Sequence, residues 1–146
     1  RERLPYCFMP NKYGGVPDIS INKINEKDDF EVEGVKVTPI RVMHYKLPIL
    51  GFRVKDFAYL TDVKTIPEKE FEKLKGLDTL VISALRKKEH ISHQTLSDAL
   101  RVSKRIDARK TYFSHMSHEM GLHAEIEKEL PQNTYFAYDG LEIEIF

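Results

Sequence analysis

Residues 77–84, with the sequence LDTLVISA, form a short apolar run between two segments that have helical patterning. A strand that is buried on both faces of a sheet has such a continuous pattern, whereas a half-buried strand alternates between apolar and polar residues. Strands of this kind are typical of parallel sheets that helices cover. The run therefore predicts a buried, parallel strand in a mixed, layered α/β fold.

Helices are predicted on both sides of this strand and once more further along the chain. The segment 65–75 opens with a Thr-x-x-Glu capping box at Thr65 and Glu68 and closes at a glycine. Apolar residues recur at helical spacing over 96–106. A third helix is predicted over 122–130, directly before a proline.

Period-two alternation and turn residues predict the other strands. The first 29 residues contain many breakers, so we expect a loop-rich lead-in there, with one short strand. The predicted strands are 19–21, a hairpin of 30–33 and 35–42, then 50–54 after a loop at 45–49, then 57–60 and 109–114, and a final hairpin of 133–138 and 141–146 that turns at Asp139 and Gly140.

The charge balance limits the classes of partner. The 146 residues contain 23 basic and 23 acidic side chains, which gives a formal net charge of zero. A protein that binds nucleic acid non-specifically is expected to have a positive field, so a nucleic-acid partner is not favoured, although a local basic patch remains compatible with this composition. No apolar run approaches the roughly 20 residues that span a bilayer. The single cysteine, Cys7, excludes an internal disulfide and fits a cytoplasmic location.

Polar residues of a recognisable kind follow several predicted strands. His44 follows the first hairpin, Asp62 follows strand 57–60, His93 lies in the loop after 77–84, and His115 follows 109–114. Loops beyond strand ends converge in layered α/β folds and often form the functional site. Imidazoles with a carboxylate are ligands of Zn²⁺ or Mn²⁺. The sequence therefore indicates a metal site at one edge of the sheet.

Each residue also has a purely structural interpretation, which the sequence leaves open. His44 can simply end a hairpin, and Asp62 can cap a turn. His93 can lie in the first turn of a helix that Ser92 caps. In this interpretation His90, His118 and His123 lie at the surface or in solvated loops.

Five stretches, in this order, resemble the C-terminal half of the metallo-β-lactamase-fold hydrolases. The similarity is greatest to the branch that contains phosphoribosyl 1,2-cyclic phosphate phosphodiesterase, and it extends more distantly to the tRNA 3′-processing endonuclease. It implies the C-terminal half of an αββα sandwich over residues 30–146, after the lead-in at 1–29. The stretches are VTPIRVMHYKLPILGFRV, AYLTD, ALRKKEHISHQTLSDAL, YFSHMSHEMGLHAEIEKELP and AYDGLEIEI.

The resemblance assigns roles to the residues at the strand ends. It implies that His44 and His115 bind metal, that Asp62 bridges two divalent ions (Zn or Mn), and that His93 is a catalytic residue that does not bind the metal. An imidazole with a pKa near neutrality suits the protonation of a leaving oxygen. Supporting roles are implied for Arg86, His118 and Asp139.

The resemblance also implies an activity. The expected function is a metal-dependent hydrolase, a phosphodiesterase that attacks a small cyclic or nucleotide-like phosphodiester with a metal-bound hydroxide. A nuclease acting on RNA or DNA is the first alternative. A non-catalytic interaction module is the second alternative.

One motif of the family is absent from these residues. The first metal motif of the family, His-x-His-x-Asp-His, does not occur, and the first residue is Arg1. We therefore expect that this chain is a piece of a longer enzyme, and that alone it binds metal weakly and has little activity. Half of a sandwich exposes an apolar sheet face, which also predicts a homodimer.

Overall fold

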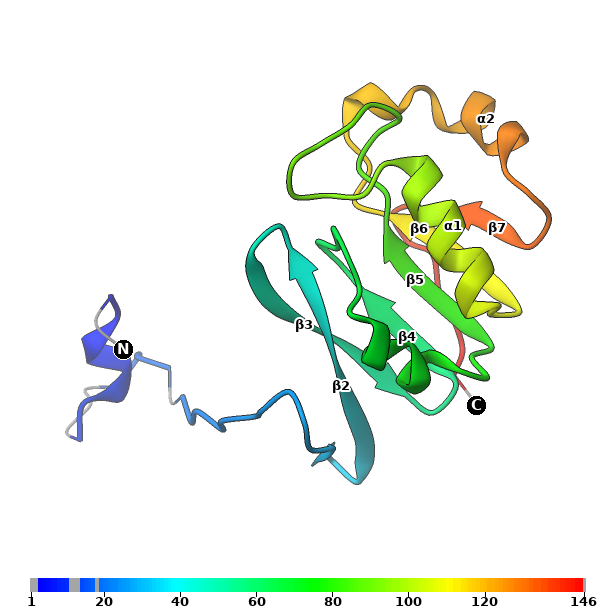
Figure 1. The fold of residues 1–146 in the computed structure, drawn as a ribbon. Helices are drawn as coiled ribbons and strands as arrows, with labels where there is room; N and C mark the ends of the chain where they lie inside the picture. Colours follow the sequence, from blue (N-terminus) through cyan, green and yellow to red (C-terminus); the bar gives the residue numbers. More distant parts are fainter. Residues whose placement is uncertain (1–2, 11–13, 18, 146) are drawn as a thin grey trace.

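The computed structural model describes residues 3–10, 14–17 and 19–145. Within these residues, seven strands form one sheet whose strand order follows the chain order (Figure 1). The pairings from β1 to β4 are antiparallel, and those from β4 to β7 are parallel. The predicted mixed, layered α/β fold is confirmed. The strands are β1 (Phe30–Val32), β2 (Val35–His44), β3 (Leu47–Val54), β4 (Phe57–Leu60), β5 (Thr79–Ser83), β6 (Lys110–Ser114) and β7 (Thr134–Phe136).

Helices cover one face of this sheet. The helix α1 (Leu96–Ile106) and the 3₁₀ helix η2 (Glu68–Leu74) lie on the same side, while the lead-in extends away from the sheet (Figure 1). No helix in the described part of the chain is long and apolar enough to cross a membrane. The other helices are η1 (Pro5–Phe8), η3 (His118–Met120), α2 (His123–Ile126) and η4 (Glu127–Glu129).

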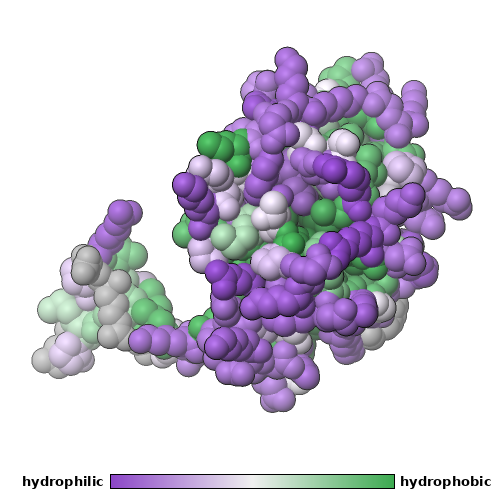
Figure 2. All heavy atoms as spheres, in the orientation of Figure 1, coloured by the Kyte–Doolittle hydropathy of each residue, from purple (hydrophilic) through white to green (hydrophobic). Residues whose placement is uncertain are grey.

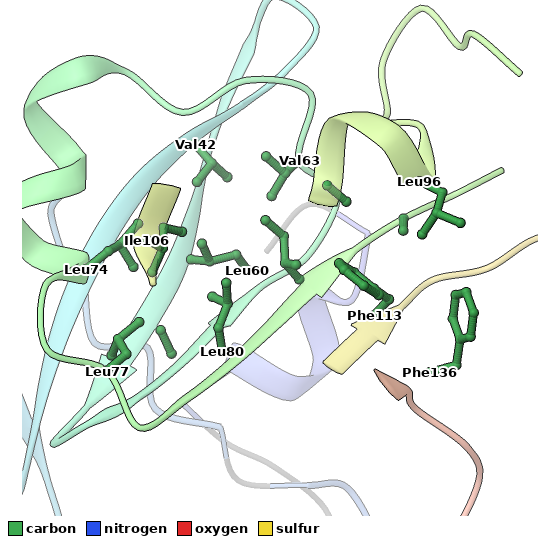
Figure 3. Packing of buried hydrophobic residues seen from close by; sticks show 14 of the residues in the cluster. Val42, Leu60, Val63, Leu74, Leu77, Leu80, Leu96, Ile106, Phe113 and Phe136 are labelled. Carbon is green, nitrogen blue, oxygen red and sulfur yellow. The ribbon is translucent and has the colours of Figure 1, made fainter. Parts of the chain in front are cut away.

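The main core lies between the sheet and α1. All five residues of β5 are buried, and this strand pairs in parallel with β4 and β6, as the apolar run predicts. Leu60, Leu80 and Phe113 are fully buried, and Ile106 of α1 packs against this cluster (Figure 3). Each such side chain contributes about 1.5–3 kcal/mol of hydrophobic free energy. This core holds the strand ends that carry the candidate site.

The opposite face of the sheet presents a row of four aromatic residues and one valine. Phe52, Tyr59, Val81, Tyr112 and Tyr135 are consecutive register partners across five strands, so their side chains share this face. The rings of Tyr112 and Tyr135 stack with centroids 5.3 Å apart, and Tyr59 is 44% exposed. The expected apolar face is therefore present, and the homodimer stays a prediction.

The face with α1 is largely polar at its surface. Figure 2 shows mostly hydrophilic atoms there, with apolar side chains visible near its centre and on the lead-in. In the lead-in, Leu4, Tyr6 and Met9 are exposed, while Cys7 is buried. The short strand predicted at 19–21 includes no residue in a strand.

The loop predicted at 45–49 is wrong. The chain reverses within two residues at Tyr45 and Lys46, and β3 already begins at Leu47, which pairs with His44. Tyr45 has a φ of 56° in the left-handed region, which a tight two-residue hairpin turn requires. The sequence pattern hid this turn because neither residue is one of the usual left-handed turn formers.

The capping box predicted for the helix at 65–75 is also wrong. The helix is a 3₁₀ helix that begins at Glu68, and no side chain caps it. The backbone of Thr65 is instead paired with Met43, with N–H to oxygen distances of 2.9 and 3.2 Å. A residue held in this bridge to β2 lies outside the helix and cannot act as its cap.

The last third of the chain differs from prediction in two places. The helix predicted over 122–130 is divided into α2 and η4. Residues 141–145 are in no strand, so the final hairpin is wrong, although Leu141 N–H does donate to Tyr138 O across the predicted turn. β7 pairs in parallel with β6 instead of with the segment that follows it.

The start of α1 is stabilised by a reciprocal capping box. The Asp98 N–H donates to Thr95 Oγ1 at 3.1 Å, and the Thr95 N–H donates to the Asp98 carboxylate at 3.2 Å. Partial burial alone would raise the pKa of the Asp98 carboxyl, but the hydrogen bonds from Thr95 and Arg101 lower it, so that the pKa lies below its ordinary value. The charged form of Asp98 therefore stabilises the fold.

Replacing Asp98 with alanine is expected to lower the free energy of unfolding at pH 7 by about 1 kcal/mol. Because the pKa is lowered in the folded chain, the charged carboxylate stabilises fully above the unfolded-state pKa of about 3.9, and this contribution is lost as the pH falls through the folded value. Urea unfolding is measured at pH 7 and at pH 3. The free energy of unfolding of the variant should differ less from that of the wild type at pH 3 than at pH 7. Glu72→Ala, at an exposed position, is the control, and an equal difference at both pH values would contradict the role of the charge.

Candidate metal centre

Four strands end at the same edge of the sheet. β2 and β4 run in the same direction because both are antiparallel to β3, and β4, β5 and β6 are parallel to one another. His44 is the last residue of β2, Asp62 follows β4, and His115 directly follows β6. His93 lies in the segment after β5. The predicted metal ligands and the predicted catalytic histidine therefore lie at one edge.

These four side chains form a single cluster. His44 Nε2 lies 3.2 Å from His93 Nε2, and His93 Nδ1 lies 3.8 Å from Asp62 Oδ1. His115 Nε2 lies 3.4 Å from the same Asp62 oxygen. The carboxylate of Asp62 thus lies between two imidazoles, one from the loop after β5 and one from the end of β6.

Two members of the cluster have a left-handed backbone. The φ angles are 55° at Asp62 and 62° at His115. This conformation is uncommon outside glycine, although aspartate and histidine adopt it more readily than most residues. Backbone strain of this kind concentrates at functional sites, where the surrounding structure enforces it. Here the strain occurs at the two strand ends that bring a carboxylate and an imidazole together.

The turn that carries Asp62 is fixed by buried hydrogen bonds. The Val63 N–H donates to Ser83 Oγ at 3.0 Å, and Ser83 is fully buried at the end of β5. The Gln94 N–H donates to Val63 O at 2.8 Å. These contacts hold Asp62 in a fixed position relative to both β5 and the loop of His93.

His93 is more enclosed than His115, with 12% of its side chain exposed against 40% for His115. Burial lowers the pKa of its imidazole, and the neighbouring His115 and His44 lower it further, while the Asp62 carboxylate acts in the opposite direction. The imidazole is therefore neutral at pH 7, with one N–H donor and one free lone pair.

The donor set fits a divalent cation. His44, Asp62 and His93 each offer a ligand atom, and these atoms lie within 4.8 Å of one another. The buried Nδ1 of His93 has no hydrogen-bond partner, and such an atom is normally satisfied by hydrogen bonding or by coordination. The group of three residues whose ligand atoms lie within 4.8 Å of one another includes His93. The resemblance implies His115, and not His93, as the third metal ligand. Both sets share His44 and Asp62, and the division of roles between His93 and His115 stays a prediction.

The alternative helical role of His93 is wrong. α1 begins at Leu96, and Thr95 rather than Ser92 is its cap. His93 thus precedes the helix. His90, which the sequence places in a solvated loop, lies with its ring centroid 5.0 Å from that of His93.

The three predicted supporting residues take no part in the short contacts that join the four residues of the cluster. Arg86 forms an ion pair with Glu119 and bonds to its own loop. His118 begins η3 and is exposed, and Asp139 is exposed in a turn. Their supporting roles stay predictions. The sequence reasoning assigned no role to Lys64, although its place two residues after Asp62 was a signal.

Comparisons with known proteins define the class. Residues 1–116 match the beta-lactamase superfamily domain, and the chain belongs to this family. It resembles the PhnP family within the metallo-β-lactamase fold. A diphosphatase of the PhnP family has a crystal structure that is 36% identical, with a TM-score of 0.84 over 87% of this chain and 49% of that protein.

Other proteins match this chain in fold, and one matches it over a larger share of its sequence than the diphosphatase does. An octanoyltransferase from Porphyromonas gingivalis (strain ATCC BAA-308 / W83) is 40% identical over 143 residues, which are 97% of this chain and 29% of that protein. YhfI from Bacillus subtilis, a metallo-β-lactamase-fold protein, is 15% identical with a TM-score of 0.65, over 81% of this chain and 53% of its own. The short form of human tRNase Z is 22% identical with a TM-score of 0.61, over 80% of this chain and 45% of its own. The chain thus spans about half or less of most of these proteins.

Proposed function

We propose that this chain forms part of the active site of a metal-dependent phosphodiesterase that acts on a small cyclic or nucleotide-like phosphodiester. The observation that supports this most strongly is the cluster of His44, Asp62, His93 and His115 at one sheet edge. The 36% identity to a diphosphatase of the PhnP family supports phosphoryl chemistry. Zero net charge disfavours a polynucleotide substrate.

The residues of the cluster have distinct proposed roles. His44, Asp62 and His115 would hold the metal, which we propose to be two Zn²⁺ or Mn²⁺ ions, since imidazole and carboxylate are ligands of both metals. When bound, such ions polarise phosphoryl oxygens and lower the pKa of a water. The edge of the sheet keeps these side chains in place without substrate, so little reorganisation is needed when substrate binds.

His93 is proposed to act on the leaving group. Breaking the P–O bond leaves an alkoxide that must gain a proton, and a neutral imidazole can donate a hydrogen bond to it through its one N–H. Full proton transfer requires the imidazolium form, which burial and the neighbouring histidines disfavour by lowering the pKa of His93 and which the nearby Asp62 carboxylate favours. The enclosed position of His93 limits competition from water.

Acyl transfer is less well supported by this site. The name octanoyltransferase describes a protein of which this chain matches 29%. Covalent acyl transfer commonly uses an activated Cys, Ser or Lys nucleophile. The cluster consists of imidazoles and one carboxylate, and the single cysteine, Cys7, lies in η1. The donor set matches metal-assisted hydrolysis instead.

An assay of the full-length protein with Mn²⁺ or Zn²⁺ tests the proposal. Ribose 1,2-cyclic phosphate and bis(p-nitrophenyl) phosphate are expected to be hydrolysed faster than structured RNA, and a chelator should abolish the activity. His93→Gln is expected to lower kcat by about 10²- to 10⁴-fold, the usual contribution of a proton-transfer residue. His123→Gln, in α2 outside the cluster, is the matched control. Preferred cleavage of RNA would favour a nuclease, and no hydrolysis of any substrate would favour an interaction module.

A further inference from the structure

The loop that carries His93 has little regular structure of its own. Residues 86–93 contain no helix and no strand, apart from one isolated bridge at Arg86. The ends of the loop are closed by two backbone hydrogen bonds, from Leu85 N–H to Gln94 O at 3.1 Å and from Leu96 N–H to Arg86 O at 3.0 Å. A compact loop of this kind depends on side chains to satisfy its interior carbonyls.

Lys64 satisfies two of these carbonyls at the end nearest His93. Its ammonium donates to His90 O at 2.7 Å and to His93 O at 3.3 Å. It also pairs with the Glu89 carboxylate at 2.5 Å. The ammonium of Lys64 has three N–H donors, and these three acceptors use all of them. Lys64 therefore has no donor left for a substrate phosphate.

Arg86 has a similar role at the other end of the loop. Its guanidinium donates to Glu89 O at 2.9 Å and to Lys88 O at 3.3 Å, and it forms an ion pair with Glu119 of η3. The two cations together hold four loop carbonyls. Lys64 connects the loop to the turn after β4, and Arg86 connects it to the segment after β6.

We propose that Lys64 is a positioning residue that holds His93 against Asp62. Lys64 lies two residues after Asp62, in the turn that buried hydrogen bonds to Ser83 and Gln94 keep fixed. One ammonium thus connects the carboxylate's own turn to the backbone oxygen of His93. Without it, His90 O and His93 O must be solvated, and only the backbone hydrogen bond from Gln94 N–H to Val63 O still connects this end of the loop to the turn. The catalytic consequence rests on the proposed function, whereas the structural consequence does not.

Lys73 offers a matched control for Lys64. Its ammonium donates to Pro39 O at 2.8 Å and to Glu26 O at 3.3 Å, and it pairs with Glu70 at 2.9 Å. The exposed fractions of the two side chains are close, at 21% for Lys64 and 27% for Lys73. Lys73 therefore donates to two carbonyls and pairs with one carboxylate, as Lys64 does, but none of its contacts is with the loop of His93.

The experiment compares Lys64→Met with Lys73→Met in the full-length protein. Amide hydrogen exchange is measured over residues 86–94, and the Cε1–H resonance of His93 is followed by NMR, both without substrate. Lys64→Met is expected to accelerate exchange in this loop by about tenfold or more, since a charged donor to two carbonyls is lost. It is also expected to shift or broaden the His93 resonance. Lys73→Met should leave both measurements as in the wild type.

Activity supplies a second comparison. With bis(p-nitrophenyl) phosphate, Lys64→Met is expected to lower kcat by about 10- to 100-fold with little change in KM, as for other residues that orient a catalytic group. Unchanged loop exchange in Lys64→Met, or an equal change in Lys73→Met, would overturn the proposal. If the wild type hydrolyses no phosphodiester, the proposed function fails, but the exchange and NMR results still decide the role of Lys64.

Discussion

Replacing Asp62 with asparagine is expected to remove most metal binding and nearly all hydrolysis. Asparagine has almost the same shape and tolerates the left-handed φ of 55°, so the turn after β4 should keep its conformation. The variant loses the charge and one ligand oxygen between His93 and His115. We expect the metal affinity to fall by more than about 100-fold, beyond the roughly 10- to 100-fold typical of residues that only support ligands.

Metal content by plasma mass spectrometry and affinity by titration calorimetry measure this effect. His115→Asn is a second test of the ligand set, since asparagine also accepts the backbone conformation there. Asp78→Asn is the matched control, because Asp78 directly precedes β5 and so lies at the opposite edge of the same sheet. Undiminished metal content in Asp62→Asn would falsify the assignment of the ligands.

Replacing Phe113 with alanine is expected to cost about 3–5 kcal/mol of unfolding free energy. Phe113 is fully buried in β6 and packs beside Phe136 of β7, with ring centroids 6.0 Å apart. Alanine leaves a cavity between the sheet and its covering segments, which the flanking strands fill only in part. Urea unfolding followed by circular dichroism gives the difference.

Phe113→Leu separates the loss of volume from the change of residue type. Leucine keeps most of the apolar volume, so its cost should stay below about 1.5 kcal/mol. Tyr135→Ala, at an exposed position of β7, removes an aromatic ring without making a buried cavity. Similar losses for the three variants would show that Phe113 does not have the central place in the core that its burial indicates.

The strands that carry the site were predictable because their sequence patterns are strong. The buried β5 follows from a continuous apolar run and the helix at 96–106 from apolar residues at helical spacing, and both are confirmed. His44, Asp62, His93 and His115 were predicted to lie together from their positions after strands, and the structure brings them together. This inference succeeds because parallel strands place their carboxyl ends at a common edge.

The failures have a common physical cause. Thr65 matched a capping box, but its backbone is paired with Met43, far away in sequence. Residues after Gly140 matched a hairpin strand, but 141–145 are in no strand, and 142–145 line a pocket with residues of β4, β5 and β6. In both cases segments far away in sequence lie beside the residues that depart from the local pattern, and a single sequence does not contain the information on which partner is available. The contacts of Lys64 with the His93 loop were missed for the same reason.

The sequential strand order has a consequence for folding kinetics. The hairpins of β2, β3 and β4 close over short turns and can form early, whereas adding β5 and β6 requires the crossing segments 61–78 and 84–109 to be ordered first. His44 belongs to the early part, and His93 and His115 join with the late part. We therefore expect the candidate metal site to be completed late in folding, so that metal uptake during refolding should follow the slowest phase and report when the native chain has formed.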